Sequence, residues 1–156
     1  RTKTIPMAYT NLLYHIVFRP KNSEPVISLA HEEVLYRYIW GYVTNKKGTL
    51  YRIGGMPDHI HMLVLLPPTL AISDFVHDLK ISTSVFLSSK KDEFPKFKGW
   101  AKSYCALTYS KHEKDVVLNY IKNQKEHHKK VSFKDELVAL LEEMGVEADL
   151  KYLFLD

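Results

Sequence analysis

The stretch MPDHIHMLVLL, residues 56–66, joins a turn to a strongly apolar run. His59 and His61 stand at the start of this run with one residue between them. Side chains two residues apart on a β-strand point to the same face of the sheet. The stretch therefore predicts a buried strand over 59–66 whose two imidazoles lie side by side and can bind one metal ion.

The segments around this strand predict the other strands of a small sheet. Residues 9–19 are β-branched and aromatic with little alternation, which is typical of a strand buried on both faces. Residues 50–55 predict a strand that turns through two glycines into 59–66, and residues 100–109 predict a fourth strand.

Apolar residues at helical spacing predict helices between and after these strands. The expected helices span 29–46, 73–88, 111–129 and 133–144, and residues 150–155 are expected to be extended. Polar residues suited to capping stand at several of the expected helix starts. The expected caps are Ser73 or Thr69, Ser110 with Glu113, and Ser132 with Asp135.

The order strand, helix, strand, strand, helix, strand is that of the split βαβ, ferredoxin-like arrangement. The predicted fold class is α+β: an antiparallel sheet with helices on one face, plus a C-terminal helix that carries Tyr120. We expect one domain over 1–156, with a core at about 9–131 and a helical tail at about 132–156. Because this fold hosts many functions, the function has to be inferred from the site.

The composition is that of a soluble globular protein, with 46% hydrophobic and 26% charged residues. A single cysteine, Cys105, excludes an intrachain disulfide, and we expect it to be a buried apolar side chain. No apolar run approaches the roughly 20 residues that cross a membrane. We expect no secretory signal and a bacterial, cytoplasmic location.

Charge is distributed unevenly along the chain, which has 22 basic and 18 acidic side chains and a net charge of +4. Residues 80–134 are rich in lysine, and this basic middle is interpreted as a surface for a phosphate backbone, with a solvated helix face as the alternative. Residues 135–149 hold acidic side chains and no basic ones, which favours a solvated helix face there.

A second group of candidate site residues lies on the expected helix 111–129. Tyr120 and Gln124 are four residues apart and therefore one turn apart on the same helix face. A tyrosine hydroxyl can attack a phosphodiester when a divalent metal polarises the phosphate, and the glutamine oxygen can be a third ligand beside the strand histidines. Two imidazoles, an amide oxygen and substrate oxygens favour Mg²⁺ or Mn²⁺ over structural Zn²⁺.

Several other polar residues keep two interpretations each. Asp58 could orient a strand histidine or belong to the turn after Pro57. For His15, a buried and hydrogen-bonded histidine is favoured over a DNA contact. For His127 and His128, a solvated helix end or a phosphate contact is favoured over a metal site.

In order and spacing, these motifs resemble the single-tyrosine HUH transposases, which are the small TnpA-type transposases of insertion sequences, and their REP-associated tyrosine transposase relatives. His59-Ile60-His61 is similar to the family's His–hydrophobic–His motif, and 120–124 to part of its tyrosine helix. Residues 14–21 resemble the family's opening strand, and 97–110 its fourth-strand region. The resemblance covers about residues 9–133.

The resemblance implies an activity and assigns roles to residues. Tyr120 would attack a phosphate of single-stranded DNA, giving a 5′-phosphotyrosine and a free 3′-hydroxyl, and a second 3′-hydroxyl would reseal the backbone. His59, His61 and Gln124 would bind the metal. The implied substrate is single-stranded insertion-sequence ends with subterminal hairpins, and the implied assembly is a homodimer whose active sites can form in trans. Bound to DNA, the protein would lie at the nucleoid.

Two alternatives stay open from the residues alone. The first is a different HUH enzyme, a replication initiator or relaxase, and the small size and single helix tyrosine argue against it. The second is a non-catalytic nucleic-acid-binding module on a ferredoxin-like fold. That alternative leaves the shared helix face of Tyr120 and Gln124 unexplained.

Overall fold

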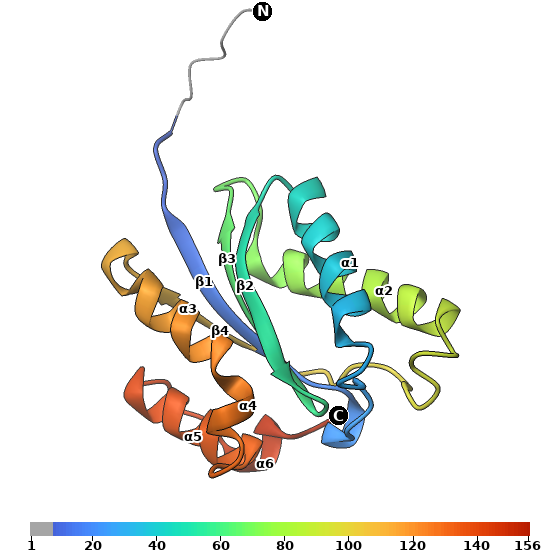
Figure 1. The fold of residues 1–156 in the computed structure, drawn as a ribbon. Coiled ribbons are helices and arrows are strands. Elements are labelled where there is room, and N and C mark those ends of the chain that lie inside the picture. Colours follow the sequence, from blue (N-terminus) through green and yellow to red (C-terminus); the bar gives the residue numbers. More distant parts are fainter. Residues whose placement is uncertain (1–7) are drawn as a thin grey trace, which may run out of the picture.

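The computed structural model describes residues 8–156, and residues 1–7 of the expected domain lie outside the described part. Its centre is a four-stranded antiparallel sheet with the strand order β2-β3-β1-β4 (Figure 1). The strands are β1 (Leu12–Phe18), β2 (Thr49–Met56), β3 (His59–Leu66) and β4 (Cys105–Tyr109). The fold class is the predicted α+β arrangement, and β3 has the predicted bounds.

Helices cover both faces of this sheet. In chain order, the helical segments are a 3₁₀ turn (Lys21–Ser23), α1 (Glu32–Asn45), α2 (Ile72–Ser89), a second 3₁₀ turn (Lys111–Glu113), α3 (Lys114–Lys122), α4 (Gln124–His127), α5 (Phe133–Glu143) and α6 (Leu150–Leu153). Helices α1 and α2 pack on one face, as predicted, and the helices that follow β4 lie on the opposite side (Figure 1). Across the described residues, no helix is both long and apolar enough to cross a membrane.

Strand β3 lies between the two helical layers, and its successive side chains point alternately toward one layer and the other. Ile60, Met62 and Val64 point toward α1 and α2 and lie in the main hydrophobic cluster. His59 and His61 point the other way, toward α4 and α5. Both layers bury this strand, so the two imidazoles lie inside the protein rather than on a solvated sheet face.

Helix α3 lies close to β2 because a glycine faces it. A Cβ added at Gly54 would lie 2.8 Å from the carbonyl oxygen of Ile121 and 3.3 Å from its Cγ2. A residue without a side chain permits this close approach of two backbones. Since Tyr120 precedes Ile121, Gly54 determines how close the tyrosine lies to the sheet.

The helix predicted over 111–129 is divided in the structure. Its predicted capping box is present, with reciprocal side-chain to backbone bonds between Ser110 and Glu113. The helix is interrupted at Asn123, whose φ of −96° and ψ of 17° leave helical geometry. Asparagine is a poor former of helix interiors because its side chain competes for backbone hydrogen bonds. The interruption places Gln124 at the start of a separate short helix.

The chain end is helical rather than extended, so the prediction for residues 150–155 is wrong. Asp149 accepts a hydrogen bond from the Lys151 N–H at 2.9 Å and thereby caps the start of α6. The start of α5 is as predicted, with Ser132 Oγ accepting from the Asp135 N–H at 3.2 Å.

The start of α2 also differs from the prediction. Its N-cap is Ala71, and neither Ser73 nor Thr69 caps the helix. The Phe75 N–H bonds to the Ala71 carbonyl at 3.0 Å, and Phe75 is fully buried. Burial of this aromatic ring, rather than a polar cap, therefore fixes the first turn.

Candidate functional site

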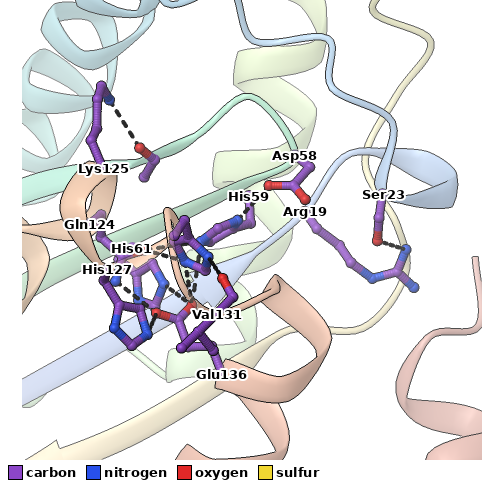
Figure 2. A network of polar contacts seen from close by, with 12 residues as sticks. Arg19, Ser23, Asp58, His59, His61, Gln124, Lys125, His127, Val131 and Glu136 are labelled. Atoms are coloured by element: carbon purple, nitrogen blue, oxygen red, sulfur yellow. Dashed lines mark hydrogen bonds and ion pairs between the residues drawn. The ribbon is translucent and has the colours of Figure 1, made fainter.

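The four residues predicted to form a site meet where β3 faces α3, α4 and α5, and Figure 2 shows three of them, His59, His61 and Gln124. His59 and His61 are fully buried, with ring centroids 5.0 Å apart. Gln124 places its Oε1 3.0 Å from His59 Nε2. The ring centroid of Tyr120 lies 5.8 Å from that of His61. The structure thus brings all four side chains together, and their chemical roles stay predictions.

The centre of the site is Glu136 on α5, a residue that the acidic composition of 135–149 assigned to a solvated face. That interpretation is wrong for Glu136, whose side chain is 1% exposed. Its Oε1 lies 2.8 Å from His61 Nε2, 3.4 Å from His59 Nε2 and 3.2 Å from His128 Nε2. Figure 2 shows the carboxylate facing the rings of His59 and His61.

The sequence does hold a signal for this carboxylate. Phe133, Leu137, Leu140 and Leu141 recur at helical spacing and pack in one hydrophobic cluster. Glu136 lies on the same helix face, three residues after the phenylalanine. A carboxylate within an apolar face is costly unless it is paired, so this position indicates buried partners.

His128 also enters the site, contrary to the expected solvated helix end. Its Nε2 lies 2.9 Å from Gln124 Oε1, and its Nδ1 lies 2.7 Å from the Val131 carbonyl oxygen. The chain turns after α4 and packs α5 back against the sheet, which covers this ring. His127 is less buried, with its Nε2 3.3 Å from Glu136 Oε2.

Asp58 and His15 contact the Nδ1 atoms of the strand histidines, which are called the outer nitrogens because they point away from Glu136. Asp58 Oδ1 lies 2.7 Å from His59 Nδ1, so this carboxylate orients a histidine. His15 on β1 is buried, as favoured from the sequence, and its Nε2 lies 2.8 Å from His61 Nδ1. These contacts leave the Nε2 atoms of both strand rings facing Glu136.

The surroundings give the two strand histidines different proton affinities. Burial lowers the pKa of His59, but hydrogen bonds with Asp58 and Glu136 outweigh it and raise the pKa to about 9. Burial lowers the pKa of His61 to about 4 despite its bond to Glu136. Burial alone would raise the pKa of Glu136, but hydrogen bonds from three imidazoles hold it well below its usual range. The carboxylate therefore stays ionised.

Tyr120 keeps its proton in this arrangement. Burial and the hydrogen bond to Glu136 raise the pKa of its hydroxyl above the ordinary value. The hydroxyl donates to Glu136 Oε2, which also accepts a hydrogen bond from Gln124 Nε2 at 2.8 Å. The ionised carboxylate thus accepts a hydrogen bond from the hydroxyl and orients it, while the low pKa of Glu136 makes this group a weak base.

The donor atoms of the site fit a divalent metal ion. One ligand atom each from His59, His61, His128 and Glu136 lies within 4.8 Å of the other three. Imidazole nitrogens and carboxylate oxygens are common ligands of divalent ions. The amide oxygen of Gln124 faces the same Nε2 atoms. The predicted histidine pair is therefore part of a larger cluster that is compatible with a metal site.

The basic middle of the chain contains both structural and exposed lysines. Lys80 donates to three backbone carbonyls, those of Ala101, Lys102 and Ser103, at 2.8, 3.0 and 3.2 Å. This lysine therefore anchors residues 90–104, here called the lysine loop, instead of presenting its charge to a ligand. The exposed lysines of this loop are Lys91, Lys96, Lys98 and Lys102.

Sequence comparison links the chain to transposases. Residues 8–124 match the family described as "Transposase IS200 like". The transposase for insertion sequence element IS200 of Salmonella typhimurium is 27% identical over 131 residues, which are 81% of this chain and 86% of that protein. The ISDra2 transposase TnpA of Deinococcus radiodurans is 36% identical over 73 residues, which are 44% of this chain and 52% of that protein.

Two solved structures share the fold. A candidate transposase from Deinococcus radiodurans superposes with a TM-score of 0.57 at 28% identity, covering 79% of this chain and 98% of that chain. A REP-associated tyrosine transposase bound to a REP hairpin superposes with a TM-score of 0.60 at 12% identity, covering 96% of this chain and 93% of that chain, which shows the fold alone. Because the family match spans both the histidine strand and the tyrosine helix, the chain belongs to the IS200-like transposase family.

Proposed function

We propose that the chain cleaves and rejoins single-stranded DNA at insertion-sequence ends through a 5′-phosphotyrosine intermediate. Family membership supports transposase activity. The observation that carries the finer mechanism is the hydroxyl of Tyr120, which donates to a carboxylate of the candidate metal cluster. A covalent tyrosine link conserves the phosphodiester bond energy while strands are exchanged.

Tyr120 is the proposed nucleophile. Its oxygen forms a bond to the phosphorus of one phosphodiester as the bond from phosphorus to the 3′ oxygen breaks, which leaves a 5′-phosphotyrosine and a 3′-hydroxyl. Glu136 Oε2, which accepts this hydrogen bond, orients the hydroxyl; the phenolic proton passes to solvent as the bond to phosphorus forms, and the departing 3′ oxygen takes a proton from solvent. Attack by another 3′-hydroxyl on the phosphotyrosine restores a phosphodiester and frees the tyrosine.

His59, His61 and Gln124 are the proposed metal ligands, and Mg²⁺ or Mn²⁺ is the proposed ion. When bound, the ion would polarise the scissile phosphate and stabilise charge on the leaving oxygen. Asp58 and His15 hold the outer nitrogens of the strand histidines, so both rings are oriented in the protein itself.

We propose single-stranded DNA with subterminal hairpins as the substrate and a homodimer as the active assembly, with the tyrosine helix acting in cis or in trans. The description of one solved relative in fold as bound to a REP hairpin supports a hairpin ligand by analogy. The exposed side chains of the lysine loop support contacts with a phosphate backbone.

The nucleophile is tested with Tyr120→Phe and a labelled oligonucleotide that carries an insertion-sequence end. With a divalent ion, the unmodified chain is expected to form a covalent adduct that survives denaturing electrophoresis. Tyr120→Phe should bind the oligonucleotide but form no adduct, while the control Tyr152→Phe, at a 59% exposed position, should form it normally. An adduct in Tyr120→Phe would overturn the assignment.

A non-catalytic nucleic-acid-binding module is the second candidate. Complete burial of His59 and His61 favours it, because hydrogen-bonded polar networks in protein interiors also serve stability alone. The same electrophoresis separates the two candidates, since a binding module forms no adduct with any divalent ion.

A further inference from the structure

The metal cluster includes two residues that lie beyond the family match. The match ends at residue 124, whereas His128 follows α4 and Glu136 lies on α5. We propose that His128 and Glu136 are direct metal ligands together with His59 and His61, so that the C-terminal helix α5 completes the metal site of this chain. This inference deepens the proposed function and rests on its metal site.

The distances around Glu136 fit shared coordination of one ion. Its Oε1 lies 2.8, 3.4 and 3.2 Å from the Nε2 atoms of His61, His59 and His128. Neighbouring ligand atoms that bind one ion at about 2.0–2.1 Å lie about 2.8–3.0 Å apart in an octahedral set and about 3.3–3.4 Å apart in a tetrahedral set. The three oxygen–nitrogen distances are therefore close to those within a ligand set, and the four ligand atoms all lie within 4.8 Å of one another.

The outer nitrogens of the three imidazoles give an independent reason. Nδ1 of His59 contacts Asp58, Nδ1 of His61 contacts His15, and Nδ1 of His128 contacts the carbonyl oxygen of Val131, at 2.7, 2.8 and 2.7 Å. Histidines that bind metals almost always engage their second nitrogen in this way, which fixes the ring and aims the other nitrogen at the ion. Here the three outer contacts aim all three Nε2 atoms at one point.

The second carboxylate oxygen connects this set to the nucleophile. Oε2 of Glu136 accepts the hydrogen bond of the Tyr120 hydroxyl, while Oε1 faces the imidazoles. Gln124 steadies the carboxylate by donating from Nε2 to Oε2 at 2.8 Å. A single side chain thus spans the metal position and the attacking oxygen, and it sets the distance between them.

The ligand set is tested by titrating Co²⁺ into the metal-free chain, because the visible absorption of Co²⁺ reports its ligands without any need for activity. Glu136→Gln and His128→Asn should each weaken binding at least about tenfold and change the absorption spectrum. The matched control Glu143→Gln, at an exposed position on the same helix, should bind as the unmodified chain does. His59→Asn serves as the reference for loss of a strand ligand.

Each outcome supports or overturns the assignment. Unchanged affinity and spectrum in Glu136→Gln and His128→Asn, with binding lost in His59→Asn, would overturn the two added ligands and leave the proposed strand site intact. Unchanged binding in His59→Asn as well would instead contradict the metal site of the proposed function. Circular dichroism verifies that each variant is folded. Glu136→Gln removes the buried carboxylate whereas His128→Asn preserves it, so the two variants would not misfold for the same reason.

Discussion

At the scale of single residues, the site depends on one buried carboxylate. Glu136 contacts the imidazoles of His59, His61 and His128, and it accepts a hydrogen bond from the hydroxyl of Tyr120. An ionised group in this position is tolerable only because its neighbours supply hydrogen bonds on every side. The same contacts that make the carboxylate acceptable in the interior place it between the candidate metal position and Tyr120, the proposed nucleophile.

One pH prediction follows from His59. Its pKa is raised to about 9, so the ring is protonated below that pH in the metal-free protein. A metal ion that binds its Nε2 has to displace this proton, and the apparent affinity should rise about tenfold per pH unit until the pH reaches the pKa. Calorimetric titrations in buffers of different ionisation enthalpy measure the proton released.

The variant Asp58→Asn supplies the control for this prediction. It removes the acceptor that raises the pKa of His59, so fewer protons should be released per metal bound at neutral pH. An identical proton count in Asp58→Asn and the unmodified chain would contradict the role given to Asp58.

The site residues that could be predicted from the sequence are those that belong to a short-range spacing pattern. His59 and His61 are separated by one residue on a strand, and Tyr120 and Gln124 are four residues apart, so short-range periodicity grouped the members of each pair. The link between the two pairs came from metal-ligand chemistry and from the family resemblance. His128 was misassigned because only the return of α5 over the helix end buries it. Glu136 was missed because the acidic composition of residues 135–149 was interpreted as a solvated helix face, although Glu136 lies on the apolar face of that helix.

At the scale of elements, the position of the tyrosine helix depends on contact with the edge strand β2. Gly54 leaves no room for a side chain below Ile121. Gly54→Ala should therefore displace α3, lower the free energy of unfolding by about 1–3 kcal/mol and reduce adduct formation more than DNA binding. Urea denaturation and the electrophoretic adduct assay measure the two effects.

Gly41→Ala is the matched control for this glycine. Gly41 lies in α1, and an added Cβ there meets nothing within 4 Å. Alanine is a better helix former than glycine, so this variant should gain about 0.5–1 kcal/mol of stability and form the adduct normally. Equal loss of adduct in both variants would argue against a specific role for the α3 contact.

Element boundaries were predicted well where the sequence contains strong terminators. Strand β3 lies between Pro57 and Pro67, and its bounds are those predicted. The break at Asn123 was not predicted because the four-residue spacing of Tyr120, Gln124 and His128 continues across it. A local interruption of this kind depends on side-chain contacts that periodicity does not contain.

At the scale of the whole molecule, the lysine loop is a basic surface outside the buried site. Replacing Lys96, Lys98 and Lys102 by alanine should weaken DNA binding and reduce its dependence on salt, by about 0.7–0.9 in the log–log slope for each lost phosphate contact. Fluorescence anisotropy over a range of salt concentrations measures this slope. The control Lys47→Ala, in the turn after α1, should leave it nearly unchanged, and an unchanged slope in the triple variant would exclude the loop from the DNA surface.

The architecture was predictable from element order, whereas the second covering layer was not. Strand β1 and strand β3 are apolar enough to require burial on both faces. Local periodicity does not predict which helix packs on the second face of the sheet. The docking of α5 instead depends on long-range packing of Phe133 and Leu137 against Cys105 and Leu107.

The distances along the chain between contacting site residues have a consequence for the order of folding. His61 and Glu136 are 75 residues apart in sequence, and Arg19 bonds to Asp156 across 137 residues. Contacts of such separation form late, because the intervening chain has to be made and closed first. A chain emerging from the ribosome exposes its histidine strand and its tyrosine well before α5 exists. Chains that have not yet reached α5 consequently lack the carboxylate that joins the two, so this site can assemble only after α5 has been synthesised.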